Sequence, residues 1–176
     1  MKLLSGLLHG TPIWVFALFG YLVWAGIRSL SLNVRKVSRV WITPIIFIAW
    51  GVVGLMMRSG PLATNLLHWF VAALIGAGVG LLTRVPLQVD SSKNVVVQPG
   101  SAVPLIRNVG IFVAHYALNV LMAMKPEMSV QYITWDIYVS GASAGYFAGW
   151  AIQFARSYRQ ALRQDPNAGV RVLSGT

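Results

Sequence analysis

The sequence contains no cysteine and very few acidic residues. With no cysteine among its 176 residues, the chain cannot form disulfides, thiolate metal sites, a covalent haem attachment or a thiol–disulfide exchange centre. Asp and Glu number 4 against 14 Lys and Arg, and all charged residues make up only 10% of the chain, whereas soluble domains average about 25%. Because 56% of the residues are hydrophobic, we predict an all-α integral membrane protein with no separate soluble domain.

Catalytic patterns are also missing from the sequence. The four acidic residues form no plausible pair within an apolar segment, and no glycine-rich loop follows a strand to bind phosphate. Ser140 and Ser143 have no neighbouring base in the sequence. We therefore expect that the chain is not an enzyme, and no motif assigns it a cofactor.

Five apolar segments approach or reach the roughly 17–25 residues that a membrane-spanning helix needs. Pro12 suits the first turn of the first segment, and Thr64 or Asn65 is the predicted N-cap of the third. No small-residue cleavage site precedes Arg28, so we expect the first segment to be retained as a helix. The predicted spans are 11–27, 40–57, 66–83, 103–124 and 134–154.

The basic residues alternate between many and few from one connection to the next. Ten lie in the segments 28–39, 84–93 and 156–171, whereas only three, Lys2, Arg58 and Lys125, lie on the opposite side. Basic loops stay in the cytoplasm, so we predict the N-terminus outside and the C-terminus inside. We therefore expect the basic residues behind the net charge of +10 to set the topology and to contact anionic lipids at the cytoplasmic face of the bilayer. We expect no nucleic acid as partner.

The connection between the third and fourth spans predicts extended structure. Two short runs flank a Ser-Ser-Lys-Asn segment, and Pro99-Gly100-Ser101 follows them, which is typical of a β-hairpin at about 87–98. The orientation places this hairpin in the cytoplasm. Residues 1–163 then form a single transmembrane bundle, and 164–176, which contain Asp-Pro-Asn, are a predicted flexible cytoplasmic tail.

Glycines at four-residue spacing mark two helix faces. Small residues on one face let helix backbones approach closely in a membrane. We favour packing between the third and fifth helices of one chain, and self-dimerisation through one of these faces is the alternative. The packing positions are Gly76 and Gly80 in the third helix and Gly141, Gly145 and Gly149 in the fifth.

The fourth span carries a polar stripe made by Asn108, His115 and Asn119, and polar groups facing lipid are costly, so we expect the stripe to face the bundle interior. The threading also places all three histidines and Asp136 in the outer half of the membrane. Imidazoles with a carboxylate could bind a metal, two imidazoles could bind haem iron, and a buried histidine could relay protons. The alternative is three ordinary histidines. The cofactor-binding candidates are His68, His115, Asn119 and Asp136, and the metal candidates are His9, His68 and His115.

Three stretches of sequence carry a family resemblance: LLHGTPIW at 7–14 with GIRSL at 26–30, the segment 90–101, and the run 104–117. They resemble a family of small bacterial inner-membrane proteins of unknown function, over nearly the whole chain. The arrangement of spans around a short cytoplasmic insertion is similar to that of CcdC-like membrane proteins, a group linked to cytochrome c biogenesis. The resemblance implies an inner-membrane location and supplies no catalytic residue.

Two classes of function follow from these observations. The first is a membrane protein that binds a partner or acts as an assembly factor, either as a homodimer or with another membrane protein. The second is a small transporter or a haem- or metal-handling protein that uses the polar stripe and the outer histidines. No inverted repeat, which would favour a secondary transporter, is evident.

Overall fold

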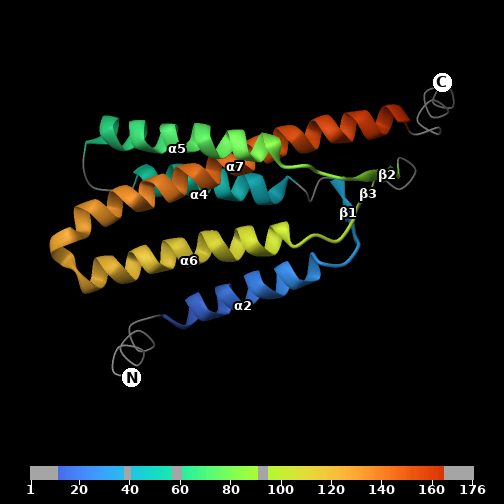
Figure 1. Cartoon of the computed structure of the whole chain (residues 1–176). Helices are drawn as coiled ribbons and strands as arrows, with labels where there is room; N and C mark the ends of the chain where they lie inside the picture. The colour runs from blue at the N-terminus through green and yellow to red at the C-terminus, as the bar shows by residue number, and fades with distance from the viewer. Residues whose placement is uncertain (1–11, 38–40, 57–60, 91–94, 165–176) are drawn as a thin grey trace. The chain divides into compact units, whose positions relative to one another are not determined.

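The computed structural model describes residues 12–37, 41–56, 61–90 and 95–164, which are mostly helical (Figure 1). They fall into two compact units. Unit 1 comprises Met1–Ser31 and Gly100–Asp136, and unit 2 comprises Leu32–Pro99 and Ile137–Thr176. In chain order the elements are α2 (Ile13–Arg28), β1 (Asn33–Lys36), α4 (Ile42–Met56), α5 (Leu62–Leu82), β2 (Gln88–Asp90), β3 (Val95–Gln98), α6 (Val103–Met124), η1 (Pro126–Met128) and α7 (Ser129–Gln164).

Each of the five predicted apolar segments contains a helix, and the boundaries differ most for α5 and α7. The helix α5 begins at Leu62 with Pro61 in the N-cap position, so the cap predicted at Thr64 or Asn65 is wrong. The backbone N–H of Asn65 already donates to the Pro61 carbonyl at 3.1 Å, as expected inside a helix. The helix α7 is longer than predicted because nothing in its polar C-terminal part, rich in Arg and Gln, breaks a helix.

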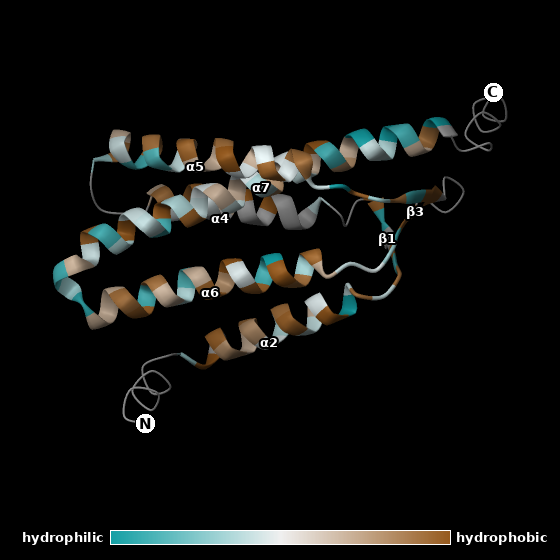
Figure 2. Cartoon of the chain, in the orientation of Figure 1, coloured by the Kyte–Doolittle hydropathy of each residue, from teal (hydrophilic) through white to brown (hydrophobic). Residues whose placement is uncertain are grey.

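Two of the described helices, α5 and α6, are long and apolar enough to cross a membrane. The described parts of α2 and α4 have 16 and 15 residues, which is shorter than a typical span. Figure 2 shows hydrophobic residues along α2, α5 and α6, and a more hydrophilic C-terminal part of α7. The predicted tail 164–176 lies outside the described residues from residue 165 onward.

A small antiparallel sheet in unit 2 has the strand order β1-β3-β2. The predicted hairpin is confirmed as β2 and β3, in which Val89 pairs with Val96. The sequence did not predict β1, whose Val34 pairs with Val97 on the other side of β3. Val96 is fully buried and packs with Val85 and Phe154, so the central strand is fixed against the C-terminal part of α7.

Glycines bring α5 and α7 of unit 2 into backbone contact. A Cβ on Gly145 would lie 2.6 Å from the carbonyl carbon of Ala73, and one on Gly149 would lie 2.9 Å from that of Ala77. Such separations are too short for any side chain, because carbon atoms normally approach to about 3.5–4.0 Å. The same backbone-to-backbone closeness holds at the remaining predicted packing positions, Gly76, Gly80 and Gly141. All five glycines therefore serve a helix contact within the chain.

Unit 1 is built around the pair α2 and α6. A Cβ on Gly26 would lie 2.9 Å from the Leu105 Cα, and the rings of Phe19 and Phe112 lie 5.3 Å apart. Ser29 closes the end of the pair, because its hydroxyl donates to the Gly26 carbonyl at 2.6 Å and its carbonyl accepts from the Ser101 amide at 2.8 Å. The polar atoms at this end of α2 are thus satisfied inside the unit.

Candidate functional site

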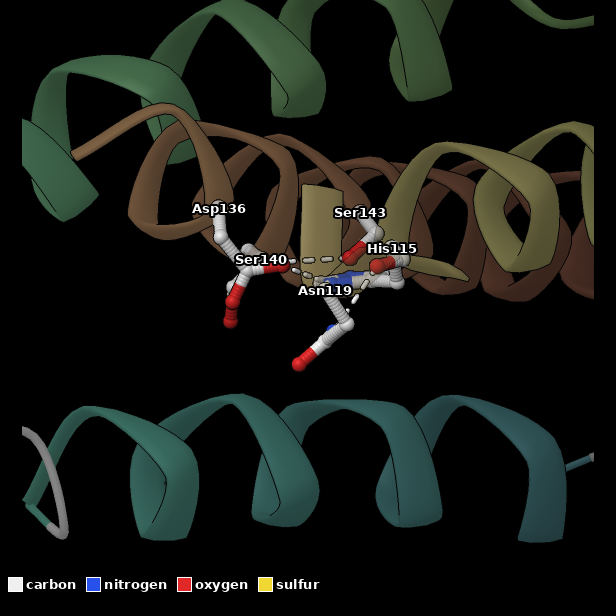
Figure 3. Close-up of polar contacts among 5 residues, drawn as sticks. All are labelled: His115, Asn119, Asp136, Ser140 and Ser143. Atoms are coloured by element: carbon white, nitrogen blue, oxygen red, sulfur yellow. Dashed lines mark hydrogen bonds and ion pairs between the residues drawn. The ribbon is translucent and has the colours of Figure 1, made fainter. Parts of the chain in front are cut away.

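Two ionisable side chains of unit 1, His115 of α6 and Asp136 of α7, lie in direct contact (Figure 3). The His115 Nδ1 lies 2.5 Å from the Asp136 Oδ1. The Asp136 side chain is 1% exposed, whereas the imidazole is 33% exposed. The pair therefore combines a buried carboxylate with a partly accessible ring.

The chain brings these residues together by a tight reversal between α6 and α7. After Met124 the helix ends, and the single 3-10 turn η1 reverses the direction, with the Met128 amide donating to the Lys125 carbonyl at 3.1 Å. Asp136 then lies about two turns after the start of α7 at Ser129. Because both helices leave the same reversal, residues at similar distances from it lie at the same level, as His115 and Asp136 do.

Asn119 lies one turn beyond His115 on α6. Its amide donates to the His115 carbonyl at 2.8 Å, and its side chain is exposed. Asn108, the third member of the predicted stripe, accepts from the Arg107 Nε at 3.0 Å. None of the 22 residues of α6 is buried, so the expectation that the stripe faces the interior of a bundle is not met by Asn119.

The chemistry of the pair follows from its two protonation states. A buried carboxylate is costly unless it is paired and hydrogen-bonded, and in a membrane such groups are rare. With Asp136 ionised, the carboxylate only accepts and the proton lies on Nδ1, whereas with Asp136 protonated the Nδ1 accepts from the carboxyl group. In both cases the Nδ1 is engaged with the Asp136 carboxyl group, and the contact holds one shared proton.

The other histidine candidates belong elsewhere. The His68 ring lies 5.2 Å from the Tyr138 ring, and both residues belong to unit 2. His9 lies outside the described residues. Among the residues that the structure describes, no group of three or more His, Asp or Glu side chains is placed to hold a metal ion. The metal set of His9, His68 and His115 stays a prediction.

Unit 2 contains two buried side-chain donors that were not among the predicted site residues. Asn65 and Trp69 lie one turn apart on α5, and each is 9% exposed. Within the described residues, neither the Asn65 Nδ2 nor the Trp69 Nε1 has a hydrogen-bond partner. The serines that Figure 3 also labels form a local helix contact, in which the Ser143 hydroxyl donates to the Ser140 carbonyl at 2.9 Å.

No curated protein and no solved structure matches the chain. A family's sequence profile does match, over residues 1–166, and its description is "Family of unknown function". The chain therefore belongs to the family of unknown function DUF6622.

Proposed function

We propose that the chain is a multi-pass protein of the bacterial inner membrane, in which α2, α4, α5, α6 and α7 cross the bilayer. The length and apolarity of α5 and α6 support this proposal, as does the alternation of basic residues along the sequence. The N-terminus is then outside, and the sheet and the C-terminus are in the cytoplasm. The similarity to CcdC-like proteins stays an expectation about architecture.

We further propose that this membrane protein works by relaying protons through His115 and Asp136, without a catalytic centre of its own. The single observation that carries the proposal is the 2.5 Å contact between the Nδ1 and the buried carboxylate. An ionisable pair inside an apolar helical unit is costly, and in membrane proteins such groups mark proton or ion paths. An ionised carboxylate stabilises an imidazolium, so the pair can take up a proton and release it again.

The proposal belongs to the transport class of function rather than to metal or haem handling. Two titratable groups suffice to pass a proton, whereas a metal site needs three or more ligands from the protein in most cases. The contact joins two of the four candidate cofactor residues, and His68 belongs to the other unit. Proton transfer is therefore the chemistry that the described geometry supports best.

Proton flux into liposomes tests this function. The purified chain is reconstituted with a pH-sensitive dye inside, and a potassium gradient with valinomycin drives protons across. We expect the wild type to pass protons faster than protein-free liposomes, and Asp136→Asn and His115→Gln to fall to the protein-free rate. His68→Gln is the matched control, since it removes an imidazole outside the pair.

Two results would contradict the relay. Asp136→Asn that conducts like the wild type would leave the carboxylate as a structural hydrogen-bond partner. A loss of flux in His68→Gln equal to that in His115→Gln would remove the special role of the pair. Reconstituted amount and helical content are measured for each variant, so that loss of folded protein is separated from loss of function.

A second function, binding of a protein partner or a role in assembly, is favoured by the sheet. The order β1-β3-β2 leaves β1 and β2 at its edges, and the Val34 side chain on β1 is 57% exposed. Sheet edges accept an extended segment of another protein. A partner that co-purifies with the wild type and is lost with Val34→Lys, which places a charge on the edge strand, would favour this function.

A further inference from the structure

A groove of about 320 Å³ lies along the C-terminal part of α7 in unit 2. It is separate from the His115–Asp136 pair, which belongs to unit 1. Trp41, the residue directly before α4, also lines the groove. Its lining consists of Trp41, Ala151, Ile152, Ala155, Arg156 and Arg159.

The lining has an apolar part and a cationic part. Residues three and four apart share a face of a helix, so Ala151, Ala155 and Arg159 follow one another along α7. Arg156 and Arg159 are exposed, and neither forms an ion pair with a residue in the described part of the chain. The groove therefore runs from small apolar side chains to two guanidinium groups with no acidic residue among them.

Aromatic packing holds the wall of the groove in place. The Trp41 ring meets the Phe154 ring edge to face at a centroid distance of 5.8 Å. Phe154 is 1% exposed and stacks on Trp150 at 5.6 Å and on Tyr158 at 6.2 Å. Because these rings are packed together, the groove is a preformed feature of unit 2.

We propose that this groove binds an anionic phospholipid, with its phosphate on Arg156 and Arg159 and its glycerol and acyl portion along Ala151, Ile152 and Trp41. The two parts of the lining match the two parts of such a lipid. Guanidinium groups bind phosphate oxygens in a bidentate manner, and basic pockets between helices on the cytoplasmic side hold anionic headgroups. The proposal depends on the membrane location proposed above and is independent of the proton relay.

The level of the groove in the proposed membrane threading supports a lipid rather than a soluble phosphate as its ligand. The apolar segment of α7 ends near residue 154, and both arginines follow it, so the guanidinium groups lie at the level of the cytoplasmic headgroups in the proposed threading. Tryptophan is enriched at the same level. A soluble phosphate would use the arginines alone and leave the apolar part of the groove without a function.

Ligand-induced stabilisation of the full-length chain in detergent tests the site. Short-chain phosphatidylglycerol, short-chain phosphatidylcholine and inorganic phosphate are added separately at the same ionic strength, and the unfolding temperature is recorded. Phosphatidylglycerol is expected to stabilise the wild type, and the other two are not. Arg156→Gln with Arg159→Gln is expected to weaken the apparent affinity for phosphatidylglycerol about thirtyfold.

The matched control is Arg84→Gln with Arg163→Gln, which removes the same charge from two exposed positions of unit 2 outside the groove. It is expected to keep the affinity within about threefold. Equal weakening by both double variants would overturn the site and leave only general attraction to the basic surface. Stabilisation by inorganic phosphate or by phosphatidylcholine equal to that by phosphatidylglycerol would overturn the lipid assignment.

A groove-filling variant adds a test that keeps both arginines. Ala155→Leu places a larger side chain in the lining, and we expect it to reduce stabilisation by phosphatidylglycerol while leaving both charges in place. Unchanged affinity in a folded Ala155→Leu protein would contradict a role for the apolar part. The arginine variants decide the outcome if Ala155→Leu does not fold, because their side chains are exposed.

Discussion

Replacement of Gly145 by alanine should separate α5 from α7. The added Cβ would lie 2.6 Å from the carbonyl carbon of Ala73 and 2.7 Å from its Cα, about 1 Å closer than carbon atoms normally approach. Both atoms belong to a helix backbone, so neither can move without shifting α5. Overpacking of this kind costs typically 1–3 kcal/mol, and we expect about 3 kcal/mol because the obstacle is backbone.

The net loss is smaller because alanine favours a helix by about 1 kcal/mol over glycine. We therefore expect Gly145→Ala to lower the free energy of unfolding by roughly 2 kcal/mol. Gly78→Ala on α5 is the control, since a Cβ there would meet nothing within 4 Å. The control should be neutral or more stable by up to about 1 kcal/mol.

Unfolding in mixed micelles, followed by circular dichroism as SDS is added, measures both variants. We expect the two variants to unfold at clearly different SDS fractions. Gly145→Ala should unfold at a lower SDS fraction than the wild type, and Gly78→Ala at the same or a higher one. Equal stability of the two variants would refute the close contact between α5 and α7. A stable Gly145→Ala protein that only loses self-association would place that face at a dimer contact instead.

Two further predictions concern buried side chains of unit 2, measured by the same unfolding assay. Asn65→Leu should raise the free energy of unfolding by about 1 kcal/mol, because a buried donor without a partner costs roughly 1–3 kcal/mol; a loss of stability would show that the amide is satisfied. Val96→Ala should lower the free energy of unfolding by roughly 2 kcal/mol because Val96 is 0% exposed at the centre of the sheet. The control Val34→Ala, at a side chain that is 57% exposed, should change it by less than about 0.5 kcal/mol, and an equal effect at both positions would contradict the burial.

Helices and the hairpin were predictable because their signals are local. The apolar segment 103–124 coincides with α6, and the short runs around Ser-Ser-Lys-Asn are β2 and β3. The strand β1 could not be predicted in this way, since its four residues, Asn-Val-Arg-Lys, carry no alternation and pair with a strand far along the chain. Such non-local pairing is decided by the fold rather than by the segment itself.

In the candidate site, too, the individual residues were predictable from the sequence and their contacts were not. Polarity inside an apolar segment singled out His115 and Asp136 separately, but their contact depends on the reversal at η1, which sequence spacing does not reveal. The expected interior position of Asn119 is not observed: its side chain is exposed, and its amide donates to the His115 carbonyl of the same helix. The groove joins Trp41, directly before α4, to residues of α7 and has no sequence pattern of its own.

Both proposals require that α7 crosses the membrane with its N-terminal end outside, and cysteine labelling tests this most directly. The native chain has no cysteine, so single-cysteine variants give an unambiguous signal. Gln131 and Gln160 are exposed near opposite ends of α7, about 44 Å apart along a helix that rises about 1.5 Å per residue, which exceeds the bilayer core of about 30 Å.

The variants Gln131→Cys and Gln160→Cys are treated with a membrane-impermeant maleimide in intact cells and after permeabilisation. We predict labelling of Gln131→Cys in intact cells and of Gln160→Cys only after permeabilisation. Labelling of both variants from the same side would contradict the proposed span and, with it, the headgroup depth of the groove and the placement of the His115–Asp136 pair in the membrane.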